Sequence, residues 1–153
     1  MAESRSTQKG KAGEYLTCCD LLCKSDFKYP VHMIGEGAEN LDIFVTVGGN
    51  LGVVRVQVKS CTRAGRDGRY HWRVHRGSKS VAEYPPDAFD VLALAVLDPP
   101  LQVAYVPRNE HRRSVDLTRR EMAGLTFRRA LGLEPPNGYR ANGQTALYAE
   151  GGR

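Results

Sequence analysis

The hydrophobic pattern of the first third of the chain predicts a helix followed by strands. Between residues 9 and 24, apolar or small residues recur at three- and four-residue steps, which is typical of an amphipathic helix. The segments 27–34, 41–47 and 52–58 have the composition of strands. Two glycines and an asparagine at 48–50 separate the last two segments, so we expect a tight hairpin there.

The later pattern predicts the rest of the core. The run DVLALAVL at 90–97 is almost wholly apolar, as expected of a strand buried on both faces, and 101–106 predicts its neighbour. Thr118, with Glu121 three residues later, has the capping-box pattern and predicts a helix to about Leu131. This order of elements predicts an α/β fold, with one mixed β-sheet flanked by helices.

The length of the chain predicts a single domain. Its 153 residues match the common size of one domain, with irregular tails expected at 1–8 and 137–153. No stretch approaches the length of a membrane-spanning helix, and the N-terminal segment lacks the apolar region of a secretory signal. We therefore expect no membrane partner and a cytoplasmic location, at the nucleoid when bound to DNA.

Four cysteines are present, and three of them fall within the first predicted helix. A zinc site usually joins two separated ligand pairs, and the chain offers no matching second pair of Cys or His. We therefore expect buried thiols that pack as small apolar groups.

The charge of the chain points to an anionic partner. The formal net charge is +5, and arginine dominates the basic residues. A polar segment at 61–80, which holds a short alternating strand at 70–74, carries one basic cluster, and a second cluster lies at 108–129. Arginine forks match phosphate oxygens, although many charged runs are simply solvated faces. The residues that we expect to contact DNA are Arg63, Arg66, Arg69, Arg73, Arg76 and Lys79.

The hairpin brings four groups of chemical interest together. Asp42 begins one strand, and Gln57 and Lys59 lie near the end of its partner, where period-two geometry places their side chains on one face and Val58 on the other. Hydrolysis of a phosphodiester needs a divalent cation and a positive charge for the developing oxyanion. Asp42 and the Val58 carbonyl are oxygen ligands suited to Mg2+, and Lys59 supplies the charge.

These residues resemble a known motif. Asp42, followed by Gln57-Val58-Lys59, is similar to the active site of the PD-(D/E)XK nuclease superfamily, in the version with glutamine at the acidic position. That version resembles the group I intron-encoded (homing) endonucleases, which also have a GE pair in a first helix and a VQVKS-like strand end. The resemblance implies a restriction-endonuclease-like core, a Gly13-Glu14 pair in which Glu14 joins the metal ligands, and Gln57 among the ligands.

The resemblance implies a metal-dependent endonuclease that cuts double-stranded DNA, with site specificity of the homing type as one form. Two alternatives stay open: a structure-selective nuclease like a Holliday junction resolvase, and a catalytically inactive DNA-binding module. We expect a homodimer or homotetramer, because a duplex presents two strands related by approximate two-fold symmetry. Alternating apolar residues at 101–105, with Leu125, Phe127 and Leu131, are candidates for its interface.

His71 and His75 lie four residues apart in the alternating segment at 70–74 and just after it. They share a face with arginines and have no third ligand nearby, so we expect phosphate contact or solvent exposure rather than zinc binding.

Overall fold

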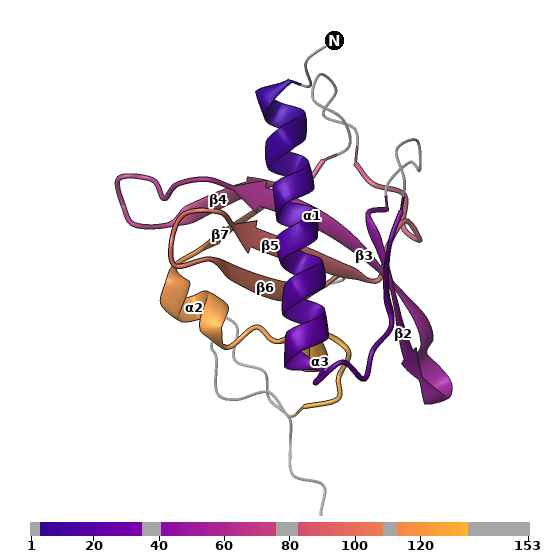
Figure 1. The fold of residues 1–153 in the computed structure, drawn as a ribbon. Helices are drawn as coiled ribbons and strands as arrows, with labels where there is room; N and C mark the ends of the chain where they lie inside the picture. Colours follow the sequence, from indigo (N-terminus) through magenta and orange to yellow (C-terminus); the bar gives the residue numbers. More distant parts are fainter. Residues whose placement is uncertain (1–3, 35–40, 76–82, 109–112, 135–153) are drawn as a thin grey trace, which may run out of the picture.

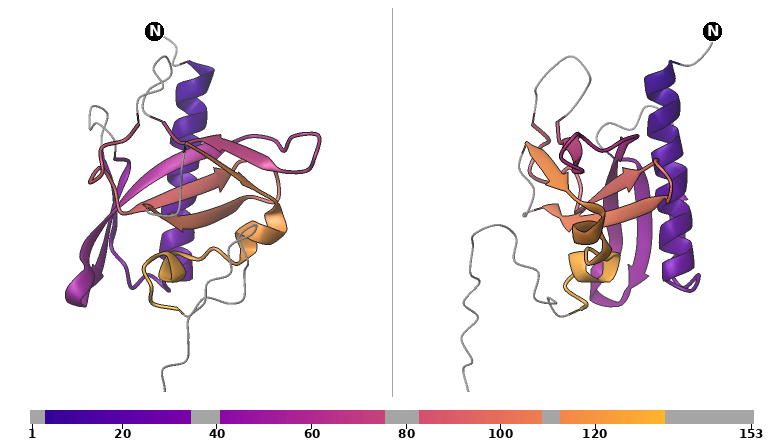
Figure 2. Two further views of the ribbon diagram at one scale, coloured as in Figure 1. Left: turned by 180° about the vertical axis from the view of Figure 1, so that it is seen from behind. Right: turned by 90° about the vertical axis from the view of Figure 1, so that its left-hand side faces the viewer.

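A computed structural model describes residues 4–34, 41–75, 83–108 and 113–134. A five-stranded mixed sheet forms the centre of the molecule. The helix α1 (Arg5–Lys24) covers one face of this sheet, and a two-stranded sheet lies on the other, as the three views show (Figures 1 and 2). The predicted α/β fold, with a mixed sheet flanked by helices, is confirmed.

The central sheet has the strand order β1-β2-β3-β5-β6. Its members are β1 (Val31–Met33), β2 (Ile43–Gly48), β3 (Gly52–Cys61), β5 (Val91–Val96) and β6 (Gln102–Pro107). Neighbouring strands are antiparallel except β3 and β5, which run parallel. A parallel pair needs a crossover connection, and here the crossover is the segment between residues 61 and 91.

The two-stranded sheet joins segments that are far apart in sequence. It pairs β4 (Tyr70–Arg73) with β7 (Ser114–Leu117), and Tyr70 lies opposite Leu117. The sequence pattern predicted β4 but missed β7, whose partner strand lies more than forty residues earlier in the chain. Inward-facing side chains of this sheet pack on the face of the central sheet opposite α1.

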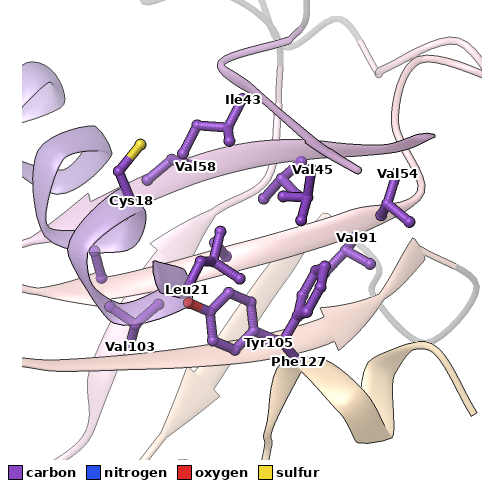
Figure 3. Packing of buried hydrophobic residues seen from close by; sticks show 13 residues of the cluster. Cys18, Leu21, Ile43, Val45, Val54, Val58, Val91, Val103, Tyr105 and Phe127 are labelled. Carbon is purple, nitrogen blue, oxygen red and sulfur yellow. The ribbon is translucent and has the colours of Figure 1, made fainter. Parts of the chain in front are cut away.

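The core consists of two layers on either side of β5. All six residues of β5 are buried, as the run DVLALAVL predicted. Val91, Ala93 and Ala95 face α1, whereas Leu92, Leu94 and Val96 face the two-stranded sheet. In the first layer, Cys18 and Leu21 of α1 pack over strand residues, with aromatic rings below (Figure 3).

The N-terminal helix begins earlier than its hydrophobic pattern predicted. The Ser4 side chain accepts a hydrogen bond from the backbone N–H of Thr7, and this cap starts α1 at Arg5. Residues 5–8 are therefore helical, not part of an irregular tail; residues 137–153 lie outside the described residues. After the helix, Asp26 and Phe27 have positive φ, so the strand predicted from residue 27 is confined to β1.

The single helix predicted for 118–131 is wrong, although its capping box is present. The helix α2 (Arg119–Ala123) ends at its C-cap, Gly124. Thr126 then caps a separate helix, α3 (Phe127–Ala130), by accepting a hydrogen bond from the backbone N–H of Arg129. A second capping residue eight positions after the first thus divides the predicted helix in two.

Two further predictions need correction. Three residues proposed for an oligomer interface are instead core residues: Val103, Tyr105 and Phe127. The rings of Tyr105 and Phe127 contact edge to face, with 5.4 Å between their centroids. The four cysteines are free, but only Cys18 is buried, while Cys19 and Cys23 are exposed.

In the described part of the chain, no helix is long and apolar enough to cross a membrane.

Candidate active site

The site begins where β2 stops pairing with β3. The last register pair at this end is Ile43 with Val56. Two residues further along β3, the Val58 N–H therefore lacks a backbone partner from β2, and it donates to the Asp42 carboxylate at 2.7 Å instead. The Asp42 N–H in turn donates to the Val56 carbonyl at 3.2 Å, which fixes the backbone of the aspartate. Asp42 thus lies beside Val58, as the hairpin predicted.

The two faces of β3 separate the polar side chains from the core. Val58 packs in the layer beneath α1, with Val45 and Ile43 (Figure 3). Gln57 and Lys59 extend from the opposite face, and Gln57 is only 5% exposed. This confirms the predicted facing of the three residues.

The nitrogen of the Gln57 side-chain amide forms hydrogen bonds, whereas its oxygen forms none with the described residues. Its Nε2 donates to the Asp42 carboxylate and, at 3.3 Å, to the Val58 carbonyl. Its Oε1 is buried and has no hydrogen-bond partner among the described residues, and an unpaired buried acceptor is costly. Rotation of the carboxamide by half a turn would exchange these atoms and give three oxygens around one point. Such a set of hard oxygen donors fits a divalent cation.

The Lys59 ammonium is held on the same face. Its Nζ donates to the His75 carbonyl at 3.2 Å and lies 5.1 Å from the centre of the Tyr84 ring. Burial lowers the pKa of Lys59, and the negative charge of Asp42 opposes that effect. The site therefore holds a desolvated cation close to a carboxylate.

Glu14 lies near enough to Asp42 for their charges to interact, and it is carried there by a helix that lies very close to β3. A Cβ at Gly13 would be 2.8 Å from the Ser60 Cβ, so only glycine permits this approach. The Ser60 hydroxyl donates to the Lys9 carbonyl at 3.1 Å, which ties the helix to the strand. Burial raises the pKa of Glu14, and the nearby charge of Asp42 raises it further.

The electrostatics of the two carboxylates also favour a cation. Burial raises the pKa of Asp42, whereas the Val58 N–H, the Lys59 charge and the Gln57 amide lower it. Asp42 and Glu14 are thus partly buried acids that repel each other, and a divalent cation would relieve this repulsion. Among the described residues, no three His, Cys, Asp or Glu side chains converge on one point. The candidate ligand set contains only two acids and takes its other oxygens from Gln57 and the Val58 backbone.

The predicted DNA-contacting residues lie on the crossover between β3 and β5. Arg63, Arg66 and Arg73 are exposed. Arg69 instead has its guanidinium group 3.0 Å from the Glu121 carboxylate, and it donates to the Asp116 carbonyl at 2.8 Å. Its contacts hold the crossover to β7 and α2. Arg76 and Lys79 lie outside the described residues.

Several arginines of the second basic cluster have structural contacts. Arg108 and Arg119 lie over aromatic rings, with distances of 4.8 and 5.1 Å to the ring centres. Arg128 pairs with Glu134 at 3.1 Å. These contacts stabilise the fold around α2, α3 and β6, so the first cluster is the better candidate for binding phosphate.

The two histidines of β4 and its end have different surroundings. The His71 ring lies 2.5 Å from the Asp116 carboxylate across the two-stranded sheet and is largely exposed. His75 contributes its carbonyl to Lys59, and its Nδ1 is buried without a hydrogen-bond partner. Neither belongs to a cluster of three possible metal ligands in the described parts of the chain.

Sequence reasoning missed three contacts at this site. These are the His75 carbonyl and the Tyr84 ring around Lys59, and the close approach of Gly13 to Ser60. The GE pair named Gly13, but its contact depends on how the helix packs. Nothing in the local sequence around Tyr84, which lies in the segment before β5, links it to Lys59 of β3.

Comparison with solved structures finds a protein that shares this fold. The chain is similar to the structure of a bacterial homing endonuclease, I-Ssp6803I, with a TM-score of 0.61 and 17% sequence identity. The match covers 75% of this chain and 79% of that one. Neither a protein-family profile nor a curated protein sequence matches the chain. The likeness therefore establishes a shared fold.

Proposed function

We propose that this protein is a metal-dependent endonuclease of the PD-(D/E)XK type that hydrolyses phosphodiester bonds of double-stranded DNA. One observation carries the proposal. The Asp42 carboxylate meets the Val58 N–H and the Gln57 amide just before the start of β2, while Lys59 extends from the same face as Gln57. The shared fold with a homing endonuclease supports it.

The proposed metal ligands are the carboxylates of Glu14 and Asp42, the Gln57 amide oxygen and the Val58 carbonyl. These are oxygen donors of the kind that Mg2+ prefers. A bound divalent cation supplies Lewis-acid polarisation of the phosphate and makes a nearby water more acidic.

The protein's own groups prepare the rest of the reaction. The Asp42 carboxylate is fixed by the Val58 N–H, so it needs little reorganisation when DNA binds. The Lys59 ammonium supplies positive charge next to the scissile phosphate and orients the attacking water. Because Lys59 is partly buried, its charge is screened less than an exposed lysine's would be.

A cleavage assay tests this function. Purified protein, incubated with Mg2+ and supercoiled or linear duplex DNA, should convert the DNA to cut products, and a chelator should stop the reaction. Lys59→Ala and Asp42→Asn should each lower the rate by at least about a hundredfold while DNA binding survives. Lys28→Ala, which removes an exposed lysine outside the site, should leave the rate unchanged. Wild-type cleavage rates in the Lys59 and Asp42 variants would refute the proposed centre.

A catalytically inactive DNA-binding module is the second candidate. Its support is Gln57, a neutral side chain at a position where the motif usually has an acid, which lowers the negative charge available to hold metal. The same assay separates the two. Duplex and four-way-junction DNA that bind tightly but stay uncut over a range of Mg2+ and Mn2+ concentrations would favour the module. Junction cleavage without duplex cleavage would favour a resolvase-like enzyme.

We further propose a homodimer or homotetramer, since one site acts on one strand and a duplex presents two. Val103, Tyr105 and Phe127 lie in the core and cannot form the interface, whereas Leu101, which was proposed with them, is 58% exposed. Light scattering at micromolar concentration, with and without DNA, measures the mass. A stable monomer that cuts both strands in one encounter would refute the assembly.

A further inference from the structure

The Lys59 ammonium lies in a defined position away from bulk water. The His75 carbonyl accepts its hydrogen bond at 3.2 Å, and the Tyr84 ring lies 5.1 Å away on another segment. A lysine side chain has four flexible bonds, so an ammonium without such contacts would sample many positions. These two contacts restrict it to one.

The Tyr84 ring is itself held by the core. It contacts the Phe89 ring edge to face, with 5.2 Å between centroids and 84° between planes, and Phe89 is 1% exposed. The Arg108 guanidinium donates to the Tyr84 carbonyl at 3.2 Å and lies over the Phe89 ring. The backbone and the ring of Tyr84 are therefore both anchored, so its position relative to Lys59 is set by the central sheet.

The chemistry of the ring suits a cation. An aromatic face carries partial negative charge and attracts an ammonium without donating a hydrogen bond or accepting a proton. A carboxylate at the same place would form a tight ion pair and weaken the attraction of Lys59 for a phosphate. An aromatic ring thus holds the cation in place while leaving its charge available.

We propose that Tyr84 is a positioning residue, whose ring holds the Lys59 ammonium in the orientation that the reaction needs. This inference rests on the proposed function, because Lys59 is the group that would act on the phosphate. Tyr84 acts through Lys59 and needs no contact with DNA. The ring, and not the hydroxyl, carries the effect.

Three variants test this role. Tyr84→Phe keeps the ring, Tyr84→Leu removes it, and Phe27→Leu removes an aromatic ring that is 71% exposed and outside the site. Thermal unfolding first establishes that all three are folded. Single-turnover cleavage and DNA binding are then measured separately at saturating Mg2+. Tyr84→Leu should lose about tenfold in cleavage rate with an unchanged dissociation constant, whereas the other two should retain the wild-type rate.

A nuclear magnetic resonance measurement tests the contact without cleavage. The ε-methylene protons of Lys59 should show the upfield ring-current shift of a group above an aromatic face in wild type and Tyr84→Phe, and should lose it in Tyr84→Leu. Equal rates for Tyr84→Leu and wild type, or equal losses in Tyr84→Phe and Tyr84→Leu, would overturn the inference. If the wild type cuts no DNA, the proposed function fails, and an absent ring-current shift would then overturn the contact as well.

Discussion

Gly13→Ala adds one methyl group where α1 meets β3. The new Cβ would lie 2.8 Å from the Ser60 Cβ and 3.6 Å from the Ala95 Cβ. Carbon atoms pack best at about 3.5 to 4.0 Å, so the helix must move about 1 Å outward from the sheet. Ser60 has little room to yield, because β3 pairs with β5 at this position and the Ser60 hydroxyl is bonded to the Lys9 carbonyl. The next residue of the helix, Glu14, would move with it.

Two opposing energies decide the stability of this variant. Alanine is favoured over glycine inside a helix by about 1 kcal/mol. Overpacking of a tight contact costs about 1 to 3 kcal/mol. We therefore expect Gly13→Ala to unfold between about 0 and 2 kcal/mol more easily than wild type. The effect on the reaction should be larger, since a misplacement of about 1 Å can lower a rate about a hundredfold.

Chemical denaturation and single-turnover cleavage measure these effects. Gly10→Ala is the matched control, since it lies in the same helix and an added Cβ would meet nothing within 4 Å. It should be up to about 1 kcal/mol more stable than wild type, with an unchanged cleavage rate. If Gly13→Ala gains the same stability and cleaves at the wild-type rate, then the close approach does not position Glu14.

Three further predictions concern metal, salt and pH. If Gln57 is a ligand, Gln57→Glu should cleave at lower Mg2+ than wild type and Gln57→Ala should lose most activity; identical Mg2+ titrations would exclude this role. The slope of log affinity against log salt should fall by about one unit for each phosphate-binding arginine replaced by alanine, tested first at Arg63, Arg66 and Arg73. Slopes that stay unchanged would make these residues ordinary surface charge. Burial raises the pKa of Asp90, but hydrogen bonds from the Arg55 side chain and backbone outweigh this and hold it below its usual value. Because the pKa of Asp90 is lower in the folded protein than in the unfolded chain, the ionised carboxylate stabilises the fold above about pH 4. This stabilisation is lost as the pH falls through the folded-state pKa. Asp90→Asn should therefore be less stable at pH 7, by about 1 kcal/mol or less because the pair is solvent-exposed, with the difference vanishing in acid; equal unfolding curves at pH 7 would contradict this.

The sequence predicted those parts of the fold whose signal is local. The run at 90–97 is apolar throughout because β5 is covered on both faces, and the Gly48 to Asn50 turn marked the hairpin between β2 and β3. The strand β7 was missed because its partner lies more than forty residues away, at β4. The break between α2 and α3 was missed because Gly124 inside an amphipathic pattern was not recognised as a helix end.

The same distinction applies to the candidate site. Period-two alternation and hairpin pairing were sufficient to place Asp42 beside Gln57 and Val58. The position of Tyr84 over Lys59 depends on where the crossover returns to the sheet, and no local pattern encodes that path. The salt bridge between Arg69 and Glu121 could not be predicted either. The sequence does not show whether an arginine pairs with a distant acid or faces solvent.

The one parallel strand pair, β3 with β5, obliges the chain to cross the sheet once. Three features that surround the proposed ligands lie on that crossing: the exposed Arg63, Arg66 and Arg73, the His75 carbonyl and the Tyr84 ring. Under the proposed function, a graft of the 62–90 segment from a related chain would transfer the candidate phosphate contacts and the support of Lys59 together. Target preference and turnover would then be inherited as one trait.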